Sequence, residues 1–231
     1  MKPYYERDGV QIFHGESLSV LSAIPAESVD TVLTDPPYFL PASHYSVRSG
    51  TSRSIGDLSI LEHFAKDVFR EMARVLLPTG FLYSFCDGQS YPIFYFAAYP
   101  HVARLRPLIW DKAVSINGYA WRHQHELILF AEKKDAPRIP TGDGDVIRTR
   151  AVPIRERMHL AEKPVDLLKK LTAKTTPEQG TVLDPFAGSG ATLEAARSLG
   201  RRAIGIEIEE RYCEIAAKRL EQMVLPLEAV S

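Results

Sequence analysis

Residues 181–207 constrain the fold more than any other stretch of the chain. The run 181–184 is apolar and β-branched, as in a buried strand, and the glycine-containing turn 185–190 follows it directly. A helix is predicted over 191–199 and a second strand over 202–207. A strand, a turn, a helix and a further strand are the repeating unit of doubly wound sheets. We therefore predict an α/β fold with a single, mostly parallel, doubly wound sheet.

The glycine-containing turn lies where doubly wound folds let a ligand approach the backbone. Gly188 and Gly190 begin a G-x-G pattern, but a dinucleotide-binding fingerprint needs a third small residue where this chain has Leu193. This departure argues against a dehydrogenase. Glu207 ends the following strand, where its carboxylate could accept hydrogen bonds from two ribose hydroxyls. A solvated strand end is the simpler explanation of a lone glutamate, but the glycines upstream lead us to favour the ribose role.

A second strand ending lies far upstream, where the β-branched run 28–34 stops at Asp35-Pro36-Pro37-Tyr38. Proline lacks an N–H group and fixes its own φ, and it also pushes the preceding residue toward an extended conformation. The turn is therefore stiff, and it holds a carboxylate, backbone carbonyls and an aromatic ring at the edge where open α/β sheets bind ligands. Such a turn suits a planar ring that bears an amino group, although most turns of this composition are only turns.

Together the two turns resemble those of the amino-group DNA methyltransferases that use S-adenosylmethionine. That family has an Asp-Pro-Pro-Tyr catalytic loop, matched by 35–38, and a Phe-x-Gly-x-Gly cofactor loop, matched by 186–190. The catalytic loop precedes the cofactor loop, which is similar to the circularly permuted order called the β class. The resemblance covers nearly the whole chain and implies a class I methyltransferase fold of the Rossmann-like type.

The resemblance implies a catalytic role for each residue of the first loop. Asp35 and the carbonyl of Pro36 would each accept one N–H of an exocyclic amine, on a base that must flip out of the duplex to reach them. Pro37 would stiffen the loop, and the ring of Tyr38 would stack on the flipped base.

The second loop and its neighbours would hold the cofactor. The resemblance assigns this role to Asp184, Phe186, Gly188, Gly190, Glu207, Lys163 and Glu16. Lys163 would contact the methionine carboxylate. Glu16 stands where the family often has an aspartate near the adenine of the cofactor.

The substrate implied by the resemblance is DNA. Aspartate at the first loop position resembles the adenine-specific enzymes, whereas many N4-cytosine enzymes have serine there. We predict site-specific transfer to N6 of adenine in double-stranded DNA, with N4 of cytosine as the alternative. Related loops act on RNA or on protein glutamine, but asparagine usually replaces Asp35 there. A DNA-binding subunit without turnover is a further alternative, against which the intact motif residues argue.

The net charge of the chain is only −1, whereas a domain that coats nucleic acid is usually clearly basic, so that class of protein is disfavoured. The charge is, however, unevenly distributed along the chain. Local phosphate contacts are predicted for arginines in two stretches without helical or strand periodicity, 39–57 and 133–158. These arginines are Arg48, Arg53, Arg148, Arg150, Arg155 and Arg157. A solvated arginine face is the alternative for the last four. We expect the first stretch to be a mobile loop that closes over DNA and the second to be a short target-recognition insertion.

The remaining expectations concern organisation and partners. The 231 residues fit one catalytic domain, 1–231. No apolar run approaches the roughly 18 residues that span a bilayer, and a signal peptide is not evident, so we expect a cytoplasmic protein of a bacterium or phage-infected cell. Cys86 and Cys213 lack metal-ligand spacing, and no metal is expected. The resemblance leaves a homodimer and a cognate restriction endonuclease open.

The clearest helix outside the two motifs is predicted over 61–77 from apolar residues at helical spacing. Ser59 and Glu62 have the spacing of a capping box at its start, and Pro78 with Gly80 is expected to end it.

Overall fold

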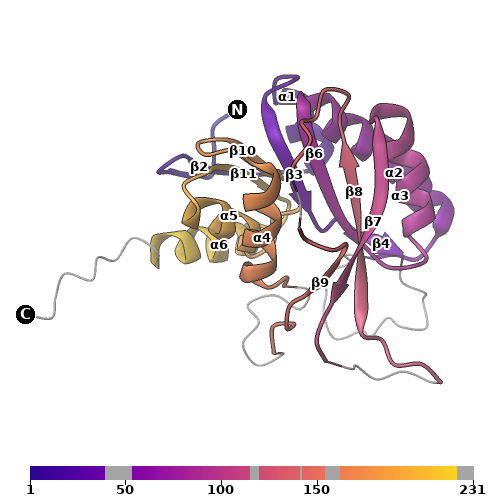
Figure 1. The fold of residues 1–231 in the computed structure, drawn as a ribbon. Helices are drawn as coiled ribbons and strands as arrows, with labels where there is room; N and C mark the ends of the chain where they lie inside the picture. Colours follow the sequence, from indigo (N-terminus) through magenta and orange to yellow (C-terminus); the bar gives the residue numbers. More distant parts are fainter. Residues whose placement is uncertain (40–53, 115–119, 141, 154–161, 223–231) are drawn as a thin grey trace, which may run out of the picture.

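A computed structural model describes residues 1–39, 54–114, 120–140, 142–153 and 162–222 of the chain. Nine of the eleven described strands form one sheet (Figure 1). Across the sheet the strands are β1 (Tyr5–Arg7), β2 (Val10–His14), β11 (Arg202–Glu207), β10 (Thr181–Asp184), β3 (Val29–Thr34), β6 (Leu76–Cys86), β8 (His125–Glu132), β7 (Arg104–Asp111) and β9 (Val146–Arg148). The strands from β2 to β6 in this order are parallel, and β8 runs antiparallel to both of its neighbours. The predicted fold class is therefore confirmed.

Helices cover both faces of the sheet (Figure 1). One face carries α1 (Ser17–Ala23), α2 (Leu58–Val75) and α3 (Tyr91–Ala98), and the other carries α4 (Val165–Thr175), α5 (Ala191–Ser198) and α6 (Glu210–Gln222). Side chains alternate along each strand, so Val182 on β10 packs in the cluster under α4–α6 while Leu183 packs in the cluster under α1–α3. Burial of both strand faces explains the nearly continuous apolar sequence of β10.

β10 and β3 are parallel neighbours, and the chain continues from them in opposite directions across the sheet, from β10 to β11 and from β3 to β6. The chain leaving β10 enters α5 on one face, whereas the first long helix after β3 is α2 on the other face. Loops that leave toward opposite faces open a crevice at the carboxyl ends of these strands, the usual ligand site of open α/β sheets. The topology thus brings Asp35–Tyr38 and Pro185–Gly190 to the same point.

Helix α2 begins earlier and ends earlier than its periodicity predicts. The carboxylate of Asp57 accepts hydrogen bonds from the backbone N–H groups of Ser59 (2.7 Å) and Ile60 (3.4 Å), so Asp57 is the N-cap. The predicted capping box is wrong, because Ser59 lies inside the first turn and Glu62 instead pairs with Lys66.

The predicted end of the same helix is also displaced. The helix stops at Val75, and residues 76–86 form one continuous strand that includes Pro78 and Gly80. A residue that precedes proline is disfavoured in the α region, which accounts for the early end.

The stretch 39–57 is bounded by a short parallel pair. Tyr38–Phe39 (β4) pairs with Ser54–Ile55 (β5), so the two ends of this stretch are held together beside the catalytic loop. Residues 40–53, and with them the expectation of a mobile loop that closes over DNA, lie outside the described residues. Within the described part of the chain, no helix has both the length and the apolar character needed to cross a bilayer.

Candidate active site

The two loops are joined at their roots by a buried aspartate. The hydroxyl of Thr34, at the end of β3, donates to Oδ1 of Asp184 over 2.6 Å, and the backbone N–H of Phe186 donates to the same oxygen over 3.1 Å. Burial, and to a smaller extent the nearby charge of Asp35, raise the pKa of Asp184 to about 6 against the opposing effect of these hydrogen bonds. Asp184 therefore fixes the cofactor loop to the catalytic strand.

The pKa of Asp184 predicts a dependence of stability on pH. An aspartate in the unfolded chain ionises near pH 4, so between about pH 4 and 6 the folded protein holds this proton more tightly. The free energy of unfolding should then fall as pH rises through that window, by about 3 kcal/mol for a shift of about two pKa units. Urea unfolding of wild type and Asp184→Asn at pH 4 and pH 7 should show this fall in the wild type only. Parallel pH profiles for the two proteins would contradict the assignment.

Both glycines of the cofactor loop have left-handed backbone conformations, with φ of +52° at Gly188 and +80° at Gly190. Glycine adopts this region without the steric cost that a side chain brings. A Cβ added at Gly190 would also lie 2.8 Å from Cβ of Ala216 on α6. Gly190 is thus required for the close approach of α5 and α6, while Gly188 faces the end of β11.

Glu207 is held by the loop that it faces. Its buried carboxylate accepts hydrogen bonds from the backbone N–H groups of Gly188 (2.8 Å) and Glu209 (2.9 Å). A carboxylate has about four acceptor positions and can accept several hydrogen bonds at once, which suits the predicted role toward ribose hydroxyls. The structure therefore brings Glu207 and Gly188 together, as the sequence predicts for a cofactor site.

A chain of alternating charges extends away from the carboxylate of Asp35. Nζ of Lys163 lies 2.7 Å from Oδ2 of Asp35 and 3.3 Å from Oε2 of Glu126, and Nζ of Lys112 lies 2.6 Å from the other oxygen of Glu126. The ammonium of Lys163 also lies 5.1 Å from the ring centroid of Phe85. Two carboxylates and two ammonium groups balance one another in a mostly buried setting, where an unpaired charge would be costly.

The protonation states along this chain follow from its geometry. Burial works against the ammonium form of Lys163, but the charges of Asp35 and Glu126 outweigh it and raise the pKa of Lys163 above its usual range. Burial also disfavours the ionised form of Glu126, and here the two lysines outweigh it and lower the pKa. Lys163 is therefore a fixed cation between two carboxylates at neutral pH.

Lys163 lies between the catalytic loop and the cofactor loop. A small cavity of about 40 Å³ joins the two loops, and Lys163, just ahead of α4, contributes to its wall. The other lining residues are Asp35, Glu162, Leu168, Asp184, Phe186, Ala187, Gly188, Ser189, Ala191 and Thr192. The donor set fits S-adenosylmethionine: a cation suited to its carboxylate, glycine backbone for close approach, an aromatic ring, and the Glu207 carboxylate for hydroxyls.

Tyr38 lies half-buried at the start of β4. The next residue, Phe39, donates its backbone N–H to Oγ of Ser90 over 2.9 Å, which anchors the catalytic loop beside the start of α3. Burial raises the pKa of the Tyr38 phenol, Lys163 opposes this rise and Asp35 adds to it. The ring is thus a neutral aromatic surface beside Asp35.

Glu16 has a structural task in addition to its predicted role. Its carboxylate caps α1 by accepting hydrogen bonds from the backbone N–H groups of Leu18 (3.0 Å) and Ser19 (2.7 Å). Burial raises its pKa, but these bonds outweigh burial and lower it. The hydroxyl of Ser17 donates to the carbonyl of Pro185 over 2.7 Å and so connects α1 to the cofactor loop.

Sequence reasoning assigned no role to three residues that organise the site. Glu126 and Lys112 belong to the charge chain. The signal in the sequence was that each of these charged residues lies at the end of one of two consecutive strands. Arg219 on α6 is buried, donates to the carbonyl of Ser189 over 3.1 Å, and pairs with Glu162, the residue before Lys163. Arg219 therefore fixes the backbone on both sides of the cavity.

Only two of the six arginines that are predicted to contact DNA lie within the described residues. Arg148 and Arg150 are exposed at and just after β9, and Nε of Arg148 lies 3.7 Å from Oδ2 of Asp111. Arg48, Arg53, Arg155 and Arg157 lie outside the described residues.

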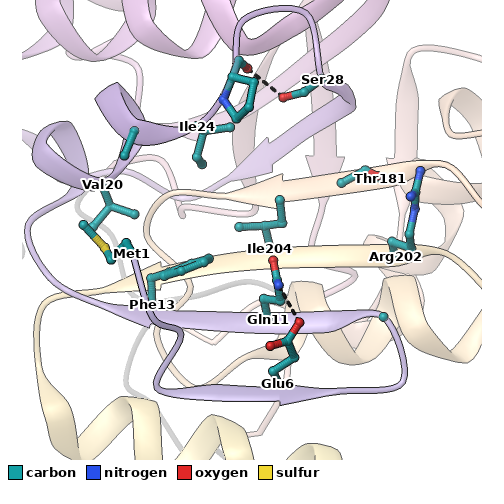
Figure 2. A pocket seen from close by; sticks show the side chains of 13 residues that line it. Met1, Glu6, Gln11, Phe13, Val20, Ile24, Ser28, Thr181, Arg202 and Ile204 are labelled. Carbon is teal, nitrogen blue, oxygen red and sulfur yellow. Dashed lines mark hydrogen bonds between the residues drawn. The ribbon is translucent and has the colours of Figure 1, made fainter.

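A larger cavity lies away from this edge. It has a volume of about 450 Å³ and is bordered by Thr181 and Arg202, the first residues of β10 and β11, and by Phe13 and Val20 (Figure 2). The two motif loops follow the opposite ends of these strands. This cavity is therefore not part of the candidate active site.

The sequence is similar to those of known methyltransferases. A type II methyltransferase of Streptococcus pneumoniae, M2.DpnII, is 31% identical over 95% of this chain and 92% of its own length. The DNA adenine methyltransferase YhdJ of Escherichia coli is 27% identical over 91% of this chain and 82% of its own length.

Solved structures share the fold. TTHA0409 of Thermus thermophilus, complexed with S-adenosyl-L-methionine, matches 92% of this chain and 95% of that chain with a TM-score of 0.70 and 25% identity. The cytosine-N4-specific PvuII DNA methyltransferase matches the whole chain and 91% of its own with a TM-score of 0.74, but at 17% identity it is evidence for the fold alone. The family model described as DNA methylase matches residues 29–218. This chain belongs to the DNA methylase family.

Proposed function

We propose that this protein transfers a methyl group from S-adenosylmethionine to N6 of a flipped-out adenine in double-stranded DNA. The observation that carries the proposal is the meeting of Asp35 with the glycine loop at the switch point of the sheet, where the hydrogen bond from Thr34 to Asp184 joins the two loops. YhdJ, whose name specifies adenine, and the aspartate at the first loop position support adenine. The N4 amine of cytosine has the same two N–H groups and is the alternative.

The chain's residues contribute positioning and electrostatics. The carboxylate of Asp35 and the carbonyl of Pro36 each accept one N–H of the target amine, which draws the nitrogen lone pair out of the ring and aims it toward the glycine loop. S-adenosylmethionine, when bound, supplies an electrophilic methyl group. Lys163 donates a charge-assisted hydrogen bond to Asp35 and so keeps an acceptor-only group facing the amine.

In this proposal the cofactor binds on the side of the crevice that faces the target amine held by Asp35. Glu207 accepts the ribose hydroxyls, Gly188 and Gly190 admit the cofactor to the backbone, and Phe186 covers it. Lys163 lines the cavity that joins the two loops, and in this proposal it contacts the methionine carboxylate. Glu16 contributes near the adenine through the helix that it caps.

The surrounding segments are proposed to bind DNA. Within 133–158, β9 adds to the sheet edge beside β7 and presents Arg148 at the same edge as Asp111. We propose this short insertion, in a single catalytic domain, as a target-recognition region with phosphate contacts from its arginines. A homodimer and an accompanying restriction endonuclease stay predictions.

The decisive test identifies the methylated nucleoside. The protein is incubated with labelled S-adenosylmethionine and unmethylated genomic DNA, and the digested nucleosides are identified by mass. N6-methyladenine supports the proposal, and N4-methylcytosine supports the alternative. No transfer to DNA rejects both, and transfer to RNA or to glutamine in a parallel reaction would redirect the assignment.

Stacking by Tyr38 gives a second expectation. Tyr38→Ala should lower turnover by about 10- to 100-fold, because loss of base–aromatic stacking costs about 1–3 kcal/mol. Tyr38→Phe keeps the ring and should remain within a few-fold of wild type. Single-turnover methylation of a short duplex compares the three proteins. Equal damage from both substitutions would exclude stacking as the role of this side chain.

A further inference from the structure

A second aromatic side chain projects at the same edge of the sheet. Trp121, in the connection between β7 and β8, is 86% exposed, the most exposed large hydrophobic side chain among the described residues. The chain's other tryptophan, Trp110 on β7, is buried and donates its indole N–H to the carbonyl of Thr149 over 2.8 Å. An indole combines a large apolar surface with a polar N–H, and tryptophan is for this reason enriched at interfaces with partner molecules.

The sheet register places the connection that carries Trp121 at the edge of the sheet that holds the candidate active site. Leu127 on β8 pairs with Cys86 at the carboxyl end of β6, and His125 pairs with Asp111 at the end of β7. The connection that carries Trp121 therefore leaves from the edge of the sheet where β3 ends, just before Asp35. Trp121 is only five residues from Glu126, which is ion-paired with Lys163.

The surroundings of Trp121 suit nucleic acid. Arg122 and His123, next in the chain, are exposed, as are Arg148 and Arg150 beside the neighbouring strand end. The side chain of Arg148 is 74% exposed. Cationic side chains that contact phosphates, together with an aromatic ring that stacks on bases, are the combination used by nucleic-acid grooves.

We propose that Trp121 inserts into the DNA base stack at the position that the flipped target base leaves. The proposal rests on the proposed function, because it assigns a DNA contact to the same edge. Extraction of a base costs a few kcal/mol in lost pairing and stacking, and an inserted apolar side chain restores stacking on the bases that remain. The indole thus stabilises the open duplex while Asp35 and Tyr38 hold the base.

The test compares two duplexes that differ in the cost of flipping. Both carry the target base at a site mapped by the nucleoside assay. In one duplex the base is in a normal pair, and in the other it lies opposite an abasic position. Trp121→Ala should lower single-turnover methylation of the paired duplex by about 10- to 100-fold, as loss of one stacking contact predicts. On the second duplex the loss should shrink to a few-fold, because the target base is already unpaired. Phe96→Ala, which removes an exposed ring from α3, is the matched control and should leave both rates unchanged.

Three outcomes would overturn the proposal: an unchanged rate for Trp121→Ala, an equal loss on both duplexes, or an equal loss in the control. The first two, obtained while the wild type methylates DNA, reject the insertion but leave the proposed function intact. Absence of DNA methylation by the wild type would instead reject the proposed function.

Fluorescence gives an independent readout that does not depend on turnover. In a Trp110→Phe protein the indole of Trp121 is the sole tryptophan. Its emission should be quenched when the mapped duplex is added together with S-adenosylhomocysteine, because insertion places the indole between bases. The proposal would also be overturned if the emission stays that of a water-exposed indole while the anisotropy of a labelled duplex reports binding.

Discussion

Asp35→Ala is expected to lower methyl transfer by about a thousandfold while S-adenosylhomocysteine binds with an affinity within a few-fold of wild type. In the proposed function the carboxylate is the side-chain acceptor for the target amine, and removal of one preorganised group of this kind costs about 10²–10³ in turnover. The cofactor loop keeps its own supports, since Asp184 and Glu207 remain bonded to Thr34 and Gly188.

Single-turnover kinetics and calorimetry measure the two effects separately. Asp35→Asn is the matched variant, because it keeps the size and one acceptor oxygen but removes the charge, and we expect it to fall between wild type and Asp35→Ala. Loss of S-adenosylhomocysteine binding in Asp35→Ala would place this carboxylate in the cofactor site and contradict the catalytic assignment.

Lys163→Met should have the largest effect on stability. It leaves the carboxylates of Asp35 and Glu126 facing the same mostly buried space without the cation between them. Removal of one partner from a buried ion pair costs about 3–5 kcal/mol. We expect a loss of this size in the free energy of unfolding, measured by urea denaturation at pH 7, together with weaker binding of S-adenosylhomocysteine.

A charge-balanced variant distinguishes the electrostatic effect from loss of packing. Lys163→Met combined with Glu126→Gln removes one charge of each sign, so most of the lost stability should return. Cofactor binding should stay weak, because the cation that faces the cofactor loop is still absent. If the double variant is as unstable as Lys163→Met, the chain of charges is not what Lys163 stabilises. Recovery of cofactor binding would remove Lys163 from the cofactor site.

The local parts of this structure could be predicted from the sequence because local rules determine them. The strands 181–184 and 202–207 appear at their predicted bounds, since apolar, β-branched runs between turn residues have few alternatives. The meeting of Asp35 with the glycine loop also follows from the sheet, because carboxyl ends of parallel strands share an edge. Helix α3 was missed because residues 91–98 are apolar on nearly all sides and lack the amphipathic period.

The charge chain could not be predicted, because it depends on long-range register. Lys112 and Glu126 meet only when β7 and β8 pair so that Asp111 faces His125. Lys163 then enters from the segment before α4, more than thirty positions along the chain from Glu126. The capping box failed for a simpler reason: Asp57 and Ser59 are both good N-cap residues, and only the backbone geometry selects between them.

The short pairing of β4 with β5 has a consequence for how such enzymes can diversify. Tyr38–Phe39 is paired to Ser54–Ile55, so the chain between Phe39 and Ser54 starts and finishes at fixed, adjacent points. The entropy of closing a flexible loop grows slowly, by about 0.6 kcal/mol for each doubling of its length. Segments of different length and sequence can therefore be exchanged between these points without displacing Tyr38, so this position is a natural junction for grafting.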